Sequence, residues 1–287
     1  MLISRDARSQ ELLPFRVDSL WGYKNKEGTV IIGPQFQHAG KFTCDIAVVA
    51  KNDKFGAIDK DNHLIIPFNH DYLRLLDSSE FLFGYRAKYF GEYFIGVMNK
   101  QGKIKFSAEY SYIFKYNNAY IVTKNKDSII GKTGNTDIRT IKTTEGLLDS
   151  TGKVLISLRY DNITWTNDSL LVVRIGDLTA DKKFIQSGYA LFNKKGEQLT
   201  GFDYMVFGNF IEGVAKARIG DKFGFIFPTG KLAIPIEFDY CEDFRKGYAI
   251  IKQNDKWGAI NRDGKIVLEP NLTYEEVKAC LKEKFGW

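Results

Sequence analysis

Residues 255–267 read Asp-Lys-Trp-Gly-Ala-Ile-Asn-Arg-Asp-Gly-Lys-Ile-Val, and close variants of this stretch recur along the chain. Trp257 and Ile260 favour a β-strand, and the apolar pair that ends the stretch favours a return strand. The side chain of Asn261 can bond to the backbone two residues further on. Gly264 can take the left-handed conformation that closes a type I turn with a bulge. The stretch therefore predicts a β-hairpin.

Seven such hairpins align, and each begins with a residue that is followed by glycine. The aligned glycines lie 34 to 50 residues apart, at Gly22, Gly56, Gly96, Gly146, Gly188, Gly224 and Gly258. A period in this range is typical of repeat arrays, whose units bury a core only together with their neighbours. A single strand such as Ile46–Val49 is expected between successive hairpins, which makes each unit three-stranded.

The pattern Lys-Trp-Gly-x-Ile-Asn-x-x-Gly-Lys-x-Val, followed by Pro-x-aromatic-Asp, resembles the WG repeat family of bacterial proteins. The resemblance covers roughly Phe15 to Pro270 and is clearest in the first, sixth and seventh copies, because the third to fifth copies lack the tryptophan. It implies an all-β repeat protein that serves as an interaction module. It carries over no catalytic residue.

The predicted fold is an all-β array of about seven three-stranded units, closed into a propeller-like toroid, with an open β-solenoid as the alternative. Closure is favoured because it removes exposed sheet edges. We expect residues 1–14 to be an irregular lead-in, 15–270 a single WG-repeat domain and 271–287 a C-terminal capping helix. Thr273 and Glu276 have the spacing of a capping box at the start of that helix.

The composition limits the classes of partner. The chain has 287 residues, a formal net charge of +6 and 14% aromatic residues. Its charges are interspersed, which is typical of a solvated surface and argues against a nucleic-acid partner. No apolar run has the length of a signal peptide or a membrane span, so no membrane partner is expected. The three cysteines form no close pair, which fits reduced thiols in a cytoplasmic protein.

The residues that recur in every unit are interpreted as structural. The aromatic residue before each glycine is expected in the core, and Asp71, Asp161, Asp203 and Asp239 are expected to cap turns. His38 and His70 lie near Asp71 in a pattern that could bind a metal, but structural histidines are far commoner. There is no nucleophile elbow or phosphate loop. We therefore predict no catalytic residue, no metal and no cofactor, and a protein that is not an enzyme.

The residues that break the period carry the functional prediction. Three segments of extra length, 84–93, 126–145 and 176–186, fall at one equivalent place in units three to five. Equivalent positions of a repeat array project from one face, so these segments are expected to form neighbouring loops. The candidate partner-binding residues are Tyr85, Arg86, Tyr89, Tyr93, Lys126, Lys132, Arg139, Lys182 and Lys183. Tyr and Arg are enriched in interface hot spots, although surface loops also vary neutrally.

The leading hypothesis is a non-enzymatic scaffold that binds another protein through the loops of repeats three to five, as an immunity, antitoxin-type or adaptor protein does. The alternative is a repeat protein that binds a carbohydrate or a cell-surface ligand through its repeated Tyr and Phe residues. Nucleic-acid binding comes third, and it would require a steep dependence on salt.

Overall fold

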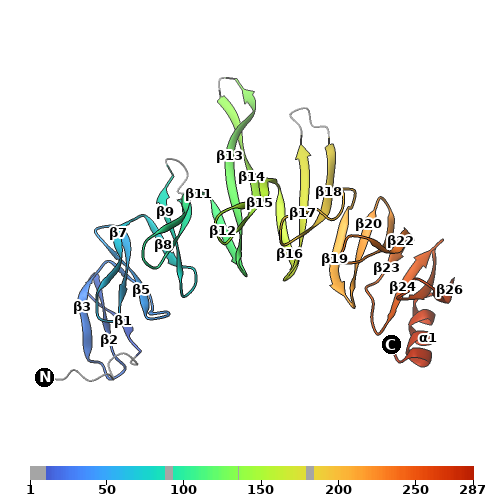
Figure 1. The fold of residues 1–287 in the computed structure, drawn as a ribbon, viewed down its shortest axis with the longest axis horizontal. Coiled ribbons are helices and arrows are strands. Elements are labelled where there is room, and N and C mark those ends of the chain that lie inside the picture. Colours follow the sequence, from blue (N-terminus) through green and yellow to red (C-terminus); the bar gives the residue numbers. More distant parts are fainter. Residues whose placement is uncertain (1–10, 88–92, 135, 179–183) are drawn as a thin grey trace. The chain divides into compact units, whose positions relative to one another are not determined.

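The computed structural model describes residues 11–87, 93–134, 136–178 and 184–287. Within these ranges the chain forms seven antiparallel sheets of consecutive strands and one C-terminal helix (Figure 1). The all-β prediction and the C-terminal helix are therefore confirmed.

Sheets 1 to 3 consist of strands β1 to β11. In chain order these are β1 (Leu13–Val17), β2 (Leu20–Lys24), β3 (Val30–Phe36), β4 (His38–Ala39), β5 (Ile46–Lys51), β6 (Lys54–Asp59), β7 (Leu64–His70), β8 (Tyr72–Leu75), β9 (Glu80–Arg86), β10 (Tyr93–Asn99) and β11 (Ile104–Tyr110). Sheet 1 contains β1 to β3, sheet 2 contains β4 to β7 and sheet 3 contains β8 to β11.

Sheets 4 to 7 consist of strands β12 to β26, and helix α1 follows. The elements are β12 (Tyr112–Tyr116), β13 (Ala119–Thr133), β14 (Thr136–Asp149), β15 (Val154–Tyr160), β16 (Asn162–Asn167), β17 (Leu170–Leu178), β18 (Phe184–Asn193), β19 (Val206–Ile211), β20 (Val214–Ile219), β21 (Lys222–Ile226), β22 (Leu232–Phe238), β23 (Tyr240–Cys241), β24 (Tyr248–Gln253), β25 (Lys256–Asn261), β26 (Ile266–Leu272) and α1 (Tyr274–Phe285). Sheet 4 contains β12 to β15, sheet 5 contains β16 to β18, sheet 6 contains β19 to β22 and sheet 7 contains β23 to β26.

The chain divides into two compact units, Met1–Asn125 with Leu148–Lys153, and Lys126–Leu147 with Val154–Trp287. The division passes through sheet 4, and each unit is described by itself below. The single repeat domain over residues 15–270 stays a prediction.

Among the described residues, five of the seven sheets have four strands rather than the predicted three. The additional strand is the short first strand of each of these sheets. In sheets 2, 3, 4 and 7 it follows the last strand of the preceding sheet after a single residue, as β8 follows β7 at Asp71, whereas in sheet 6 a longer segment separates β18 from β19. Sequence analysis assigned this segment to a turn. Strands of two to six residues are too short to show a clear alternation of apolar and polar residues.

The glycine of each repeat is required by a β-bulge on the neighbouring strand. Trp21 of β2 pairs with Phe36 of β3, but the residue two positions on, Tyr23, pairs with Ile32. Strand β3 therefore has four residues opposite two, and its backbone folds over Gly22. A Cβ atom added to Gly22 would lie 2.8 Å from the backbone nitrogen of Pro34.

The same register shift recurs in sheets 2, 3, 6 and 7. In sheet 7, a Cβ on Gly258 would lie 2.5 Å from the carbonyl oxygen of Leu268. The aromatic residue before the glycine is less buried than predicted, and it lies next to the turn at the start of its strand. Trp21 and Trp257 are half-buried, and cations cover them: the Arg16 guanidinium lies 5.9 Å from the Trp21 ring and Lys252 lies 6.0 Å from the Trp257 ring.

The hydrophobic cores lie between neighbouring sheets. Tyr23 and Val49 belong to the core between sheets 1 and 2, and Ile66 and Phe83 to the core between sheets 2 and 3. An inner strand consequently buries both of its faces, and Phe81, Leu82 and Phe83 of β9 are at most 2% exposed. No single sheet could bury this surface alone, which is why the unit must repeat.

Helix α1 covers the face of sheet 7 that points away from sheet 6. Ile251 of β24 packs in the core toward sheet 6, whereas the adjacent Ile250 packs against Val277 and Leu281 of α1. The helix begins with the predicted capping box, in which Thr273 and Glu276 bond to each other's backbone N–H groups. The chain therefore covers the outer face of its last sheet with a helix.

We expect Gly22→Ala to lower the free energy of unfolding by about 2 kcal/mol, because the new methyl group collides with the bulged backbone of β3. Gly33→Ala is the matched control. Gly33 lies in the same bulge, and an added Cβ there would meet no atom within 4 Å. Urea denaturation of both variants measures the difference, and equal stabilities would contradict the role of the bulge.

Candidate functional site

Three consecutive sheets have lengthened central hairpins, at the place where sequence analysis located the extra residues. In the other four sheets a turn of two residues joins the corresponding strands, as at Asn52-Asp53 in sheet 2 and Asn254-Asp255 in sheet 7. These are the second and third strands of sheets 2, 6 and 7 and the first and second strands of sheet 1. In sheets 3, 4 and 5 the strands β9–β10, β13–β14 and β17–β18 continue further (Figure 1). The segments predicted as loops are thus largely strand. Residues 126–133 and 136–145 belong entirely to β13 and β14.

The predicted partner-binding residues have different outcomes. Tyr85 and Arg86 end β9, and Tyr93 begins β10. Lys132 is exposed on β13. The remaining predicted residues either lie in the strands of sheet 4 (Lys126 in β13, Arg139 in β14) or fall outside the described residues (Tyr89, Lys182 and Lys183).

The structure brings Tyr85, Arg86 and Tyr93 together with Phe94, and these four residues are called the β9–β10 end. Tyr93 pairs in register with Arg86, and Phe94 with Tyr85. The side chains of directly paired residues share a face of the sheet, so Tyr85 and Phe94 lie on one face and Arg86 and Tyr93 on the other. Tyr85 is 42% exposed and Phe94 is 49% exposed.

These aromatic residues are exposed because the hairpin extends past its neighbouring strands. Strand β8 pairs with β9 only as far as Gly84, and β11 pairs with β10 only as far as Ile95. Beyond these residues the sheet has two strands, and a two-stranded ribbon cannot bury its faces. Asp71 supports its base by accepting a hydrogen bond of 2.9 Å from the backbone N–H of Arg86.

A buried charge cluster holds the opposite end of β9. The Glu80 carboxylate is bonded by Lys105, by Lys115 at 2.8 Å and by the Tyr120 hydroxyl, and Lys115 also pairs with Asp77. Burial raises the pKa of Glu80, but the bonds from the two lysines and Tyr120 outweigh it and leave the pKa below its usual value.

Glu80 is an exception to the repeat. It pairs in register with the asparagine that begins the next turn, and the equivalent position is apolar in three other sheets, at Ile46, Leu170 and Tyr248. Removing one member of a buried ion pair leaves its partner unpaired and is strongly destabilising. The cluster therefore ties β9 to β11, β12 and β13, and gives the β9–β10 end a rigid base.

His70 lies beneath Tyr85. Its ring centroid is 5.4 Å from that of Phe83 and 5.8 Å from that of Tyr85. His70 is 6% exposed, and its Nδ1 has no hydrogen-bond partner among the described residues. Burial lowers its pKa, and Lys54 adds to the lowering, while Asp71 acts in the opposite direction. His70 is thus a neutral member of the aromatic cluster.

Three of the four recurring aspartates accept the hydrogen bond that a cap requires, whereas Asp203 makes no such bond to the described residues. Asp71, Asp161 and Asp239 each accept a hydrogen bond from a backbone N–H about fifteen residues on, and Asp71 and Asp239 also pair with Lys54 and Lys222. The lysine lies two residues before the repeat glycine, so the pair joins the two motifs of the unit. The bond from this lysine is the main cause of the lowered pKa of both Asp71 and Asp239.

One group of described residues could approach a metal ion. Ligand atoms of Asp59, Asp61 and His63 lie within 4.8 Å of one another on the turn after β6. Asp59 and His63 already bond to each other at 3.0 Å, and Asp61 and His63 are exposed. The cluster is a variant of the turn that every unit contains, so it is explained by the turn. The absence of a metal and of a cofactor stays a prediction.

A neutral pocket of about 280 Å³ lies between β16 to β18 and β19. Its aromatic lining includes Trp165, Tyr189 and Phe207, and its polar lining includes Asn162 and Asn209. None of the residues that line it carries a charge. Sequence analysis did not find this pocket. The available signal was Trp165, a tryptophan outside the repeat motif.

The sequence matches the model of the WG containing repeat over residues 21–55, 95–127, 146–178, 223–257 and 257–278. The chain belongs to this family. Each matched WG repeat begins at or next to the aromatic position before the glycine. The first one, residues 21–55, contains β2 to β5 and ends in β6. A WG repeat therefore contributes strands to two neighbouring sheets.

Comparison with curated proteins finds no match. Solved structures give distant similarities. A eukaryotic initiation factor has a TM-score of 0.35 at 9% identity over 90% of this chain and 84% of its own. The tricorn protease has a TM-score of 0.36 at 9% identity over 91% of this chain and 34% of its own. Pyrococcus horikoshii acylaminoacyl peptidase has a TM-score of 0.29 at 13% identity over 93% and 47%. Similarity at these TM-scores carries no argument about function.

The only helix in the described part of the WG-repeat chain, α1, is neither long nor apolar enough to cross a membrane.

Among the exposed residues of the β9–β10 end, Phe94 was not predicted from the sequence. The sequence feature that could have indicated Phe94 is its position next to Tyr93, where the repeat period is interrupted. Exposure of one member of a Tyr-Phe pair depends on where the neighbouring strands end, which the repeat motif does not encode.

We expect His70→Phe to remove part of the pH dependence of stability. The unfolded chain binds a proton at His70 near pH 6.5, whereas the fold disfavours that proton, so wild-type stability falls as the pH drops below about 6.5. The equivalent position in other sheets holds an aromatic residue, namely Phe36, Tyr110 and Phe238. The fold should therefore accommodate a phenylalanine at position 70.

The measurement is the free energy of unfolding in urea at pH 8 and at pH 5.5. The wild type should lose up to about 1.4 kcal/mol per pH unit more than His70→Phe over this range. His38→Phe, which removes an exposed histidine of sheet 2, is the control. Parallel pH profiles for wild type and His70→Phe would show that burial of the neutral ring is not the cause.

Proposed function

We propose that this WG-repeat protein is a non-enzymatic scaffold that binds another protein through the lengthened hairpins of sheets 3 to 5. The observation that supports the proposal is the exposure of Tyr85 and Phe94 on a ribbon that extends beyond its sheet. Arg86 and Tyr93 add a cation and a second tyrosine on the other face.

The exposure of these rings is energetically unfavourable. Tyr85 and Phe94 leave aromatic surface in water although the repeat does not require an aromatic residue there, because the equivalent hairpins end in two-residue turns. A partner that covered both rings would remove this surface from water. Tyr and Arg are also the residue types that contribute most to interface hot spots. The rigid base at Glu80 reduces the entropy that binding would cost.

For the biological role, we propose an immunity, antitoxin-type or adaptor protein that acts in the cytoplasm. An immunity protein needs a rigid surface with projecting elements that can enter the active site of its target, and the long β13–β14 hairpin has that form (Figure 1). The proposed partner is a protein, and neither catalysis nor nucleic-acid binding is part of this role.

For the array, we propose an open β-solenoid in place of the favoured propeller-like toroid. A closed ring would need the outer face of sheet 7 to contact another sheet. Ile250 and Ala259 on that face are instead packed against α1. An open array needs such a cap at its end.

We expect the double variant Tyr85→Ala/Phe94→Ala to bind its partner at least 100-fold more weakly while the fold keeps its stability, because both side chains are exposed. The partner is isolated with the tagged protein from its native host, identified by mass spectrometry, purified and titrated. Ile104→Ala is the matched control, since Ile104 is a 56% exposed residue of the same sheet. Equal affinities for wild type and double variant would contradict the site.

Replacing Lys126–Glu145 by an Asn-Gly turn tests the second hairpin in the same titration. This exchange should leave the fold intact and abolish the complex, because Asn-Gly forms the tight turn that unlengthened hairpins use. Unchanged affinity would remove β13–β14 from the proposed surface and leave the β9–β10 end alone.

A second function is favoured by the neutral pocket at β16 to β19. An aromatic ring beside amide and hydroxyl groups, without charge, suits an uncharged sugar, and about 280 Å³ holds a single sugar ring. In this alternative the protein binds a carbohydrate or cell-surface ligand. A glycan array probed with wild type and Trp165→Ala should then give signals that the variant loses. A blank array for the wild type would eliminate this function and leave the protein scaffold unaffected.

A further inference from the structure

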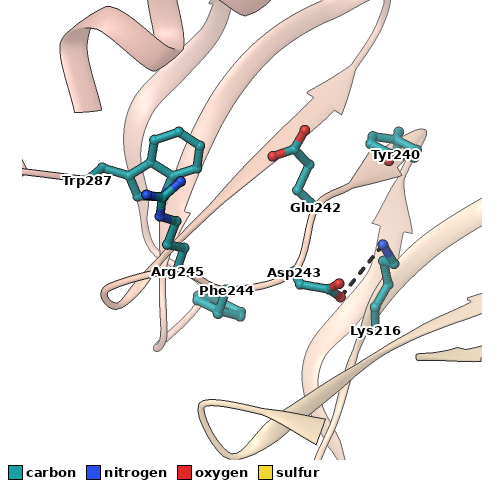
Figure 2. Close-up of a pocket in the computed structure, with 7 residues that line it drawn as sticks. All are labelled: Lys216, Tyr240, Glu242, Asp243, Phe244, Arg245 and Trp287. Carbon is teal, nitrogen blue, oxygen red and sulfur yellow. Dashed lines mark ion pairs between the residues drawn. The ribbon is translucent and has the colours of Figure 1, made fainter. Parts of the chain in front are cut away.

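A second, charged pocket lies where sheet 6, sheet 7 and the end of α1 meet. It has a volume of about 450 Å³. Figure 2 shows its lining, in which Lys216 comes from β20, Trp287 follows α1 and the remaining residues run along one segment after β22. These residues are Tyr240, Glu242, Asp243, Phe244 and Arg245.

The segment that carries the charges is held rigidly. Phe244 is 3% exposed and belongs to the core between sheets 6 and 7. The backbone N–H groups of Glu242 and Arg245 donate to the carbonyl oxygens of Ile250 and Tyr248, both at 2.9 Å. Glu242 and Arg245 therefore project from a fixed backbone, which lowers the entropy cost of binding a ligand.

The positive side of the pocket is Arg245. Its guanidinium lies 4.9 Å from the centre of the Trp287 ring, and Figure 2 shows the Arg245 side chain extending toward Trp287. Trp287 is placed by the cap of α1, where Gly286 takes the left-handed conformation. Among the described residues, no carboxylate pairs with Arg245. A guanidinium in contact with an indole ring can still donate its N–H groups to a carboxylate.

The negative side of the pocket is Glu242. One of its oxygens accepts a hydrogen bond of 2.7 Å from the Tyr274 hydroxyl of α1. This bond, more than burial, raises the pKa of Tyr274 to about 12, so Tyr274 remains a donor at neutral pH. No lysine or arginine of the described chain pairs with Glu242. Its second oxygen can therefore accept from an ammonium group.

The other charges of the pocket compensate each other. Lys216 pairs with Asp243 at 3.6 Å and lies 5.7 Å from the centre of the Tyr240 ring. The uncompensated pair in the lining is thus one cation, Arg245, and one anion, Glu242. A third unsatisfied group is the indole N–H of Trp287, whose nitrogen is buried without a hydrogen-bond partner among the described residues.

We propose that this pocket binds a free α-amino acid, with the ligand's carboxylate on Arg245 and its ammonium on Glu242. The rings of Tyr240 and Phe244 form the apolar part of the lining, so an amino acid with an aromatic or large apolar side chain is preferred. The site is independent of the β9–β10 end and of the proposed protein partner.

The test is isothermal titration of the full chain with free L-amino acids, each at up to about 10 mM, followed by analogues of L-phenylalanine. L-Phenylalanine or another apolar amino acid should bind. 2-Phenylethylamine lacks the carboxylate and 3-phenylpropionate lacks the ammonium, so each should bind at least tenfold more weakly. Glu242→Gln and Arg245→Gln should each weaken the amino acid at least tenfold, since a charge-assisted bond is lost.

Glu242→Gln keeps an oxygen for the Tyr274 hydroxyl, so its fold is preserved, and far-UV circular dichroism checks this. The matched controls are Glu275→Gln on α1 and Arg262→Gln in sheet 7, which should bind as the wild type does. The proposal is overturned if no amino acid binds, if either analogue binds as tightly as L-phenylalanine, or if both pocket variants retain wild-type affinity.

Discussion

The close approach of a bulged strand to a glycine is the constraint on which the rest of this structure depends. The bulge in β3 folds the backbone over Gly22, and the equivalent bulge in β26 brings the Leu268 carbonyl over Gly258. The strand that carries the bulge is followed after a single residue by the first strand of the next sheet, as β4 follows β3 and β8 follows β7. Any side chain at the glycine would push the outer strand away and undo that connection.

The connection also explains why a WG repeat does not coincide with a sheet. The repeat at residues 21–55 contributes strands to sheets 1 and 2, so the covalent chain ties neighbouring sheets together while their cores are shared. Each inner strand buries both faces, and the last sheet completes its outer face with α1. Such a scaffold can alter one hairpin without disturbing its neighbours, because the turn between its inner strands takes no part in these cores.

Departures from the repeat therefore mark the sites that the scaffold itself does not require. Glu80 replaces an apolar core residue, His70 replaces a core aromatic, and Tyr85 with Phe94 extends a hairpin that is tight in sheets 1, 2, 6 and 7. All four belong to sheet 3 or contact it. In sheet 7 the charges of Glu242 and Arg245 line a pocket in which no oppositely charged side chain of the described residues pairs with either of them. The recurring residues Asp71 and Asp239, in contrast, keep one structural role, because each accepts a hydrogen bond from a backbone N–H group fifteen residues further on.

The sequence by itself determined the all-β class, the family, six of the seven hairpins and the capping helix, because turn chemistry and the spacing of glycines are local properties. The fifth hairpin closes its turn at Gly196, but in the described part of the chain β18 gains only isolated bridges there and no return strand. It also located the three lengthened hairpins through the uneven period. Only the tertiary structure decided which residues at those places are exposed, since Phe94 is exposed because β11 ends its pairing at Ile95. Only the tertiary structure brought Lys216, Arg245 and Trp287 around one pocket, because they come from different elements far apart in the chain. Contacts of this kind depend on how sheets stack, which no local pattern encodes.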